Sequence, residues 1–159
     1  MGSGLNRLNR KTGDFDRINS TNSGICNDYI TSIYRDKEKN LWITTTLGLS
    51  RYDKNLKSFT CQQNRPDDLK SIIDNEVTTS LEDSRGFFWV GTNNGLNILN
   101  YSNNSFRHFT TADGLPSNSI HGIVEDKNKN LWISSKNGIS RIELKNIQNT
   151  DHFDFKSTN

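Results

Sequence analysis

Phe87-Phe88-Trp89-Val90-Gly91-Thr92 lies near the middle of the chain, and two other stretches repeat its pattern, Asn40-Leu41-Trp42-Ile43-Thr44-Thr45 and Asn130-Leu131-Trp132-Ile133-Ser134-Ser135. Neighbouring tryptophans in this pattern are 47 and 43 residues apart. A glycine stands six residues after each tryptophan, at Gly48, Gly95 and Gly138. An aspartate stands six residues before each tryptophan, at Asp36, Asp83 and Asp126. A repeat of this length indicates stacked copies of one unit, each burying its apolar face against a neighbour.

The composition of each unit decides between helices and strands, because paired-helix repeats can have a similar period. Runs of about five residues, rich in β-branched and aromatic side chains, occupy 30–34, 41–45, 49–52 and 58–61. Asn, Asp and Gly separate these runs and favour turns. Four short strands per unit are typical of a propeller blade.

The chain is therefore predicted to be all-β, a β-propeller fragment of about three four-stranded blades plus a leading half blade. It forms a single partial propeller over 1–159, with repeats at about 4–26 for the half blade, 27–73, 74–116 and 117–157. A closed propeller needs about four to eight blades. We therefore expect the chain to be a portion of a longer protein and to self-associate through its open blade faces.

Adjacent apolar residues surround each tryptophan, although neighbouring side chains on a strand point to opposite faces. Both faces of these strands must therefore be covered. We expect Trp42, Trp89 and Trp132 to pack between blades, in preference to the alternative that they stack on sugar rings.

The third copy, Asn118-Ser119-Ile120-His121-Gly122-Ile123-Val124-Glu125-Asp126 followed by Asn130-Leu131-Trp132-Ile133, resembles the two-component regulator propeller repeat. The resemblance covers 4 to about 145, and Lys39 and Lys129 depart from it where the family favours Gly. It implies a seven-bladed propeller in the periplasmic or extracellular sensor region of a membrane-anchored hybrid histidine kinase. Many such kinases detect carbohydrate breakdown products, so the resemblance implies a carbohydrate-derived ligand. It also implies that this segment is not catalytic and signals through domains not present here.

Two alternatives stay open at this point. Some propellers are lyases or glycosidases acting on polysaccharide, and such an enzyme needs an acid and a base converging on one channel. Others, resembling WD-repeat propellers, are scaffolds that bind proteins by the rim.

Propellers bind ligands over the mouth of the central channel, through loops that differ between blades. By the family's usual strand order, the loops after the tryptophan strands and the long links between blades share one face. We expect an oligosaccharide there, bound by amide, hydroxyl and cationic groups. The candidate residues are Thr46, Arg65, Asn93, Asn94, Lys136 and Asn137.

Several other functions find no support in the residues. Each repeated aspartate stands at a fixed offset from a tryptophan, so we assign it to its own turn and to no catalytic role. The stretch 126–130 begins like a calcium loop, but Leu131 replaces the required glycine. Histidines without ligand spacing predict no metal, and no cofactor fingerprint occurs. An evenly spread net charge of +2 predicts no nucleic-acid partner, and the absence of long apolar runs predicts no direct membrane contact.

Cys26 and Cys61 are the two cysteines, and each is expected in a different connection between blades. The sequence leaves open whether they form a disulfide or remain two half-buried thiols.

Overall fold

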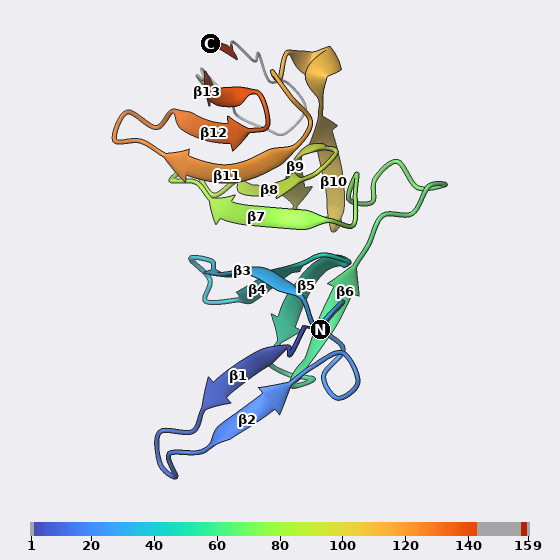
Figure 1. The fold of residues 1–159 in the computed structure, drawn as a ribbon, viewed down its shortest axis with the longest axis vertical. Helices are drawn as coiled ribbons and strands as arrows, with labels where there is room; N and C mark the ends of the chain where they lie inside the picture. The colour runs from blue at the N-terminus through green and yellow to red at the C-terminus, as the bar shows by residue number, and fades with distance from the viewer. Residues whose placement is uncertain (1, 143–156, 159) are drawn as a thin grey trace.

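The computed structural model describes residues 2–142 and 157–158, and it consists of three four-stranded antiparallel sheets preceded by a two-stranded one (Figure 1). The half blade contains β1 (Leu5–Leu8) and β2 (Phe15–Ile18). The first blade contains β3 (Ile30–Arg35), β4 (Leu41–Thr45), β5 (Gly48–Asp53) and β6 (Ser58–Gln62). The second contains β7 (Val77–Glu82), β8 (Phe88–Thr92), β9 (Gly95–Asn100) and β10 (Ser105–Phe109). The third contains β11 (Ile120–Glu125), β12 (Leu131–Ser135), β13 (Gly138–Ile142) and β14 (Ser157–Thr158).

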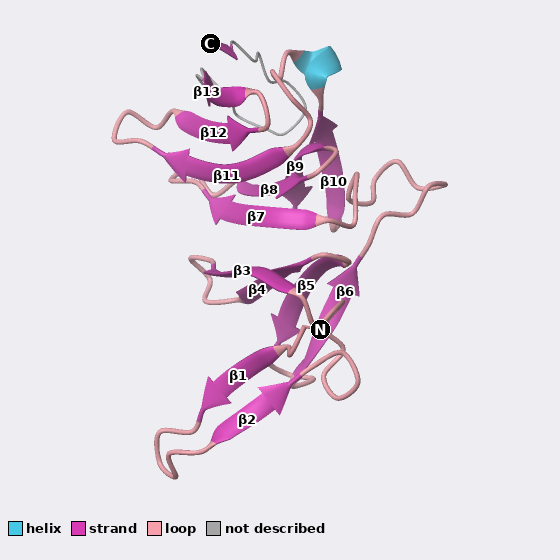
Figure 2. Cartoon of the chain, viewed as in Figure 1, coloured by secondary structure: helices cyan, strands magenta, loops and turns pink. Residues whose placement is uncertain are grey.

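The predicted all-β class, with about three blades and a leading half blade, is confirmed by these sheets. Figure 2 shows strands throughout, apart from one 3-10 turn, η1 (Thr111–Asp113). No helix among the described residues is long and apolar enough to cross a membrane. Part of the last predicted repeat, 143–156, lies outside the described residues.

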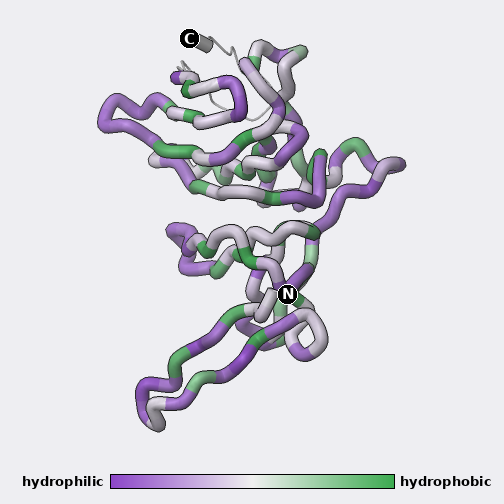
Figure 3. The backbone as a smooth tube through the Cα atoms, in the orientation of Figure 1, coloured by the Kyte–Doolittle hydropathy of each residue, from purple (hydrophilic) through white to green (hydrophobic). Residues whose placement is uncertain are grey.

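Strands follow one another across each sheet in chain order, each antiparallel to the one before. The first strands of successive blades contact each other, β3 against β7 and β7 against β11. The three blades therefore fan out from their first strands, as blades do around a propeller axis (Figure 1). Hydrophilic residues gather at the turns and hydrophobic ones recur along the strands (Figure 3).

The hydrophobic core lies between blades. Trp42 of the first blade packs against Phe88 of the second, with ring centroids 4.5 Å apart. Both side chains are fully buried, as are Trp89 and Val90 on the two faces of β8. Neither sheet could bury these groups alone, so each blade depends on its neighbour for stability.

The expectation that all three tryptophans pack between blades is wrong for Trp132. Its side chain is 41% exposed, whereas Trp42 and Trp89 are inaccessible. The same outer face of the third blade exposes Val124 and Ile139. The physical reason is position, because no further blade covers this face in the described part of the chain. The expected self-association through such faces stays a prediction.

A β-bulge in each first strand joins neighbouring blades. The register shifts between Ile30 and Ser32, and again at the equivalent place in β7 and β11. The extra residue in β3 is Thr31, whose hydroxyl donates to the Val77 carbonyl of the next blade at 2.6 Å. The bulge turns this side chain out of its own sheet and toward the neighbour. Thr78 makes the same bond from the second blade to the third, at 2.7 Å.

A second inter-blade contact lies at the aspartate turns. The Lys37 amide donates to the Glu82 carboxylate at 2.7 Å, and the Ser84 amide donates to Glu125 at the same distance. The second and third blades thus each present a glutamate, the last residue of the first strand, to the turn of the preceding blade. Hydrogen bonds to a charged acceptor are stronger than neutral ones, so these contacts fix the angle between blades.

The repeated glycines occupy backbone that other residues rarely adopt. Gly48 and Gly95 have φ of 131° and 148°, and a Cβ at either position would lie 2.7 Å from a carbonyl oxygen of the outermost strand. The aspartate turns also contain a positive φ, at Lys39, Gly86 and Lys129. The lysines therefore occupy the left-handed position that the family fills with Gly, at a steric cost of about 1–2 kcal/mol.

Each third strand carries a buried polar residue that faces the link between blades. Ser50 accepts a hydrogen bond from the Cys26 amide at 2.9 Å, and Asn97 accepts one from the Ile73 amide at 3.0 Å. In the third blade the equivalent link residue is Pro116, which has no amide hydrogen. Ser140 is buried there, and its hydroxyl has no hydrogen-bond partner within the described part of the chain.

This difference predicts opposite outcomes for two alanine substitutions. Asn97→Ala leaves the half-buried Ile73 amide unpaired and should lower the free energy of unfolding by about 1–3 kcal/mol. Ser140→Ala removes a buried hydroxyl that bonds no other described residue and should leave stability unchanged or raise it. Urea denaturation followed by circular dichroism measures both, and equal losses would show that the link amide is not what Asn97 stabilises.

Candidate functional site

The predicted ligand-binding turns lie at one end of each blade, beside the links between blades. The Thr46 amide donates to the Tyr29 carbonyl at 3.2 Å, and the Asn93 and Lys136 amides make equivalent bonds at 3.1 Å. Their acceptors are the carbonyls of Glu76 and Ser119. Each of these bonds joins a turn to the residue before the first strand of its own blade, so the prediction that the turns and the long links share one face stays a prediction.

Four of the candidate side chains lie in the later two turns, and they differ in how strongly they are held. Asn94 and Lys136 are exposed, and neither side chain has a hydrogen bond or ion pair to other described residues. The Asn137 amide donates to the Pro116 carbonyl at 2.9 Å, and Asn93 accepts from the Ser119 hydroxyl at 3.0 Å. Asn94 and Lys136 are therefore the two of these four side chains whose hydrogen-bonding groups are all unused by other described residues.

The other two candidates come from the first blade and its link. Thr46 donates its hydroxyl to the side chain of Asn27 at 3.2 Å. Arg65 pairs with Asp68, whose pKa is lowered chiefly by a hydrogen bond from the Lys70 amide and less by Arg65. Among the described residues, no hydrogen bond or ion pair joins Arg65 to the other candidates. The structure therefore places Arg65 on a long exposed link, separate from the three turns.

A polar network across two blades was missed by the sequence reasoning. The Ser119 hydroxyl donates to the Asn93 side-chain oxygen, Oδ1, at 3.0 Å and lies 3.3 Å from the His121 Nε2. His121 occupies the bulge position that threonine fills in the first two blades. The bulge brings the histidine ring to Ser119. Apart from Gly122, no residue of the sequence indicates that a bulge occurs here. Asn93, Ser119 and His121 thus extend the candidate site across the second and third blades.

The repeated aspartates lie at the opposite end of the blades, in the turns between first and second strands. Asp83 accepts hydrogen bonds from the Arg85 and Phe87 amides at 2.9 and 3.0 Å. Each aspartate also accepts from the indole Nε1 of its own tryptophan, as Asp83 does from Trp89 at 3.1 Å. These bonds occupy the carboxylates fully, so the aspartates build turns far from the candidate loops.

Asp126 shows the electrostatic effect of such a turn. Hydrogen bonds from the Asn130 and Trp132 side chains, and then from two turn amides, lower the pKa of its carboxyl to about 2. The turn thus favours the ionised carboxylate across the whole physiological range of pH. No group of three or more His, Cys, Asp or Glu side chains among the described residues is placed to hold a metal ion.

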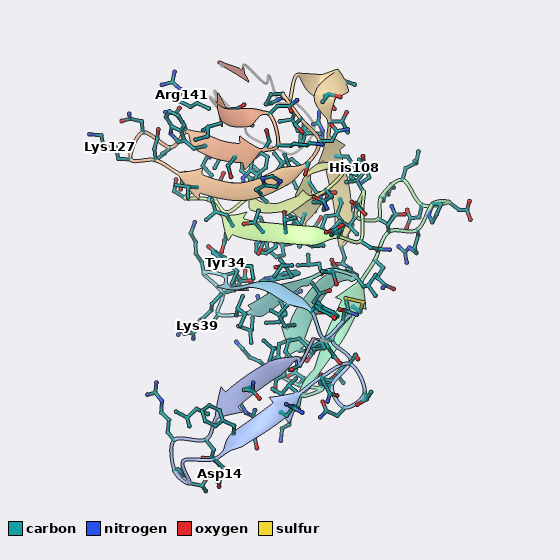
Figure 4. All side chains as sticks on the ribbon, in the orientation of Figure 1. Asp14, Tyr34, Lys39, His108, Lys127 and Arg141 are labelled. Atoms are coloured by element: carbon teal, nitrogen blue, oxygen red, sulfur yellow. A yellow bond between two sulfur atoms is a disulfide. The ribbon has the colours of Figure 1, made fainter. Side chains whose placement is uncertain are left out.

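Cys26 and Cys61 form a disulfide, with Cα atoms 5.1 Å apart. The expectation that both cysteines lie in connections is corrected for Cys61, which is part of β6. The hydrogen-bonded strand continues past the predicted end of the run at Cys61, because Gln62 still pairs with Leu49. The yellow sulfur bond beside β6 is visible in Figure 4. It ties the link that follows the half blade to the outermost strand of the first blade.

The fanned four-stranded sheets define the protein as a segment of a β-propeller. Three parts of the chain, 24–46, 71–94 and 114–137, match the family described as "Two component regulator propeller". Each match runs from a link through the first strand, the aspartate turn and the tryptophan strand. These three parts are therefore two-component regulator propeller repeats, as the resemblance implied.

Known proteins of related sequence and structure agree with this assignment. The chain is 36% identical over 179 aligned residues to histidine kinase P4 of Formosa agariphila, covering 78% of this chain and 13% of that protein. Its fold is similar to that of the extracellular domain assigned to hybrid two-component system BT3049 of B. thetaiotaomicron, with a TM-score of 0.73 and 24% identity over 96% of this chain and 20% of the other. The corresponding domain of BT4673 gives a TM-score of 0.74 at 22% identity, over 97% and 21% of the two chains. The chain thus spans between an eighth and about a fifth of the length of these relatives.

Proposed function

We propose that the chain is a non-catalytic, ligand-sensing segment of the propeller of a two-component sensor histidine kinase. The observation that carries this proposal is the 36% identity to histidine kinase P4 over 78% of the chain, which also contains three regulator propeller repeats. Signalling would occur through domains outside this segment, because a sensor works by binding one receptor state more tightly than another.

The proposed location is outside the cytoplasm, in the part of a membrane-anchored receptor that meets external ligands. Similarity in fold to two extracellular domains agrees with this location. The Cys26–Cys61 disulfide supports it independently, because such bonds persist in oxidising compartments and are rare in the cytosol.

The proposed ligand is an oligosaccharide bound at the turns after the tryptophan strands. Asn94 and Lys136 would contact it directly, because both are exposed and uncommitted among the described residues. Asn93, held by Ser119, would present an amide already fixed in place. Amide and ammonium groups suit the hydroxyl and carboxylate groups of polysaccharide fragments.

Titration calorimetry on the complete parent propeller, with oligosaccharides from enzymatic digests of polysaccharides, tests this proposal. Lys136→Ala should weaken the binding of a cognate fragment by about tenfold, the loss of one charge-assisted hydrogen bond. Lys127→Ala is the matched control, because Lys127 is equally exposed in the same blade but lies in the aspartate turn at its other end. An unchanged affinity for Lys136→Ala and Asn94→Ala would remove both from the site, and cleavage of the polysaccharide by the propeller would favour an enzyme.

A further inference from the structure

A groove of about 540 Å³ runs along the outer strands of the first blade, beneath the β9–β10 turn of the second. Arg51, Tyr52 and Gln62 line it from the first blade, and Tyr101 and Asn104 from the second. Its size is within the range of sites that hold small molecules. β5 and β6, which form its floor, are the strands of the sheet farthest from β3, so the groove lies toward the rim. We propose that this rim groove binds a neutral sugar ring, as a site separate from the loops described above.

Two tyrosine rings give the groove flat and rigid apolar surfaces. Tyr101 packs against Trp42 and Phe88, each with ring centroids 6.2 Å apart, yet 40% of it remains exposed. Tyr52 packs against Phe59 at 5.1 Å. Because packing already fixes these rings, a ligand that covers them loses little additional side-chain entropy. The weakly polar C–H face of a pyranose ring suits such an aromatic surface.

Polar groups with unused hydrogen-bonding capacity lie beside these rings. The Arg51 guanidinium lies over the Trp42 ring at 5.4 Å and has no hydrogen bond to other described residues. Gln62 donates its amide to Asn104 at 2.7 Å, which bridges the two blades across the groove. The Gln62 side-chain oxygen, Oε1, is buried without a partner in the described part of the chain. A ligand hydroxyl group that enters beside the Gln62–Asn104 bond could donate to this oxygen after a small rotation of the Gln62 side chain.

The net charge of the groove determines whether a charged or a neutral ligand suits it better. Arg51 and Lys54 carry positive charge, and Asp53 opposes them from the same wall. Hydrogen bonds from the Leu56 and Asn55 amides lower the pKa of Asp53 and keep its carboxylate charged. One net positive charge is too little to favour a polyanion. The hydroxyl groups of a neutral polyhydroxylated molecule can donate to the amide oxygens and accept from the N–H groups of the amides and the guanidinium.

Nuclear magnetic resonance on the complete parent propeller, with methyl glucoside, methyl galactoside and methyl mannoside as probes, tests the proposal. At least one probe should shift the side-chain amide signals of Gln62 and Asn104 on titration. Tyr101→Ala should weaken that binding about tenfold, and Tyr29→Ala, at another exposed tyrosine outside the groove, should not change it.

Asn104→Gly provides a variant that avoids a folding defect, because the positive φ of 54° at this residue suits glycine. It removes the bridging amide and should also weaken the probe severalfold. Lys136→Ala should leave the rim signals unchanged, so failure of the loop site and failure of the rim site are distinguishable. Unshifted Gln62 and Asn104 signals with all three probes, or unaltered affinity in both Tyr101→Ala and Asn104→Gly, would overturn the proposal.

Discussion

Asp83→Ala is expected to lower the free energy of unfolding by about 3–5 kcal/mol, a large part of the total stability of an ordinary domain. Asp83 is fully buried and accepts bonds from two turn amides, the Trp89 indole and the Arg85 guanidinium. Removing the carboxylate leaves these donors without their acceptor inside the packed space between the second and third blades. Thermal and urea denaturation, followed by far-ultraviolet circular dichroism, measure the loss.

Asp126→Ala is the matched control, because Asp126 makes the same turn and the same indole bond. Its tryptophan is 41% exposed, so water can replace the lost acceptor. A clearly smaller loss is therefore expected for Asp126→Ala than for Asp83→Ala. Equal losses would mean that the turn alone, and not burial between blades, determines the cost.

The repeated columns allowed much of the fold to be predicted, because each column has one physical task. Tryptophan fills the space between sheets, and glycine takes a backbone conformation that a Cβ would obstruct. The aspartate column was assigned to the turns, but its bond to the indole was not foreseen. A spacing of six residues does not by itself show that two side chains are in contact. In the structure, the pairing of the two strands places the Asp36 carboxylate beside the Trp42 indole.

Features that depend on contacts between blades were the ones that sequence reasoning missed. The bulge at Thr31 changes the direction of a side chain without changing the apolar pattern around it. Exposure of Trp132 depends on what covers the third blade, which its own repeat does not encode. The candidate site residues were placed by the family's usual strand order, which does not determine where a side chain on a long link lies, and Arg65 has no bond to the turns among the described residues.

The pairing of Cys26 with Cys61 could not be decided from the sequence, because their separation of 35 residues permits many geometries. In the folded blade, the Gly48 turn brings the start of β5 between the link and the end of β6. A Cβ on Gly48 would lie 2.8 Å from the Cys26 sulfur and 2.7 Å from the Gln62 carbonyl oxygen. The glycine column therefore provides the space in which this blade places its sulfur atoms. The second blade has Ile73 and His108 at the corresponding positions and no such bond.

Loss of this disulfide is expected to lower the free energy of unfolding by roughly 3–4 kcal/mol, from the chain entropy that a loop of this length regains when unfolded. The double variant Cys26→Ser with Cys61→Ser, compared with the oxidised protein by urea denaturation, measures this loss.

A reducing agent provides the matched control, because it should bring the natural protein to the stability of the double variant while leaving the variant unchanged. Identical unfolding of the natural protein with and without reductant would contradict the prediction.

Loss of the disulfide should also affect the rim groove, since Cys61 and Gln62 are neighbours in β6 and both line it. If the disulfide holds this end of the strand, reduction should also loosen the Gln62–Asn104 bridge between the blades, so one bond would link the oxidising environment to the shape of the rim groove.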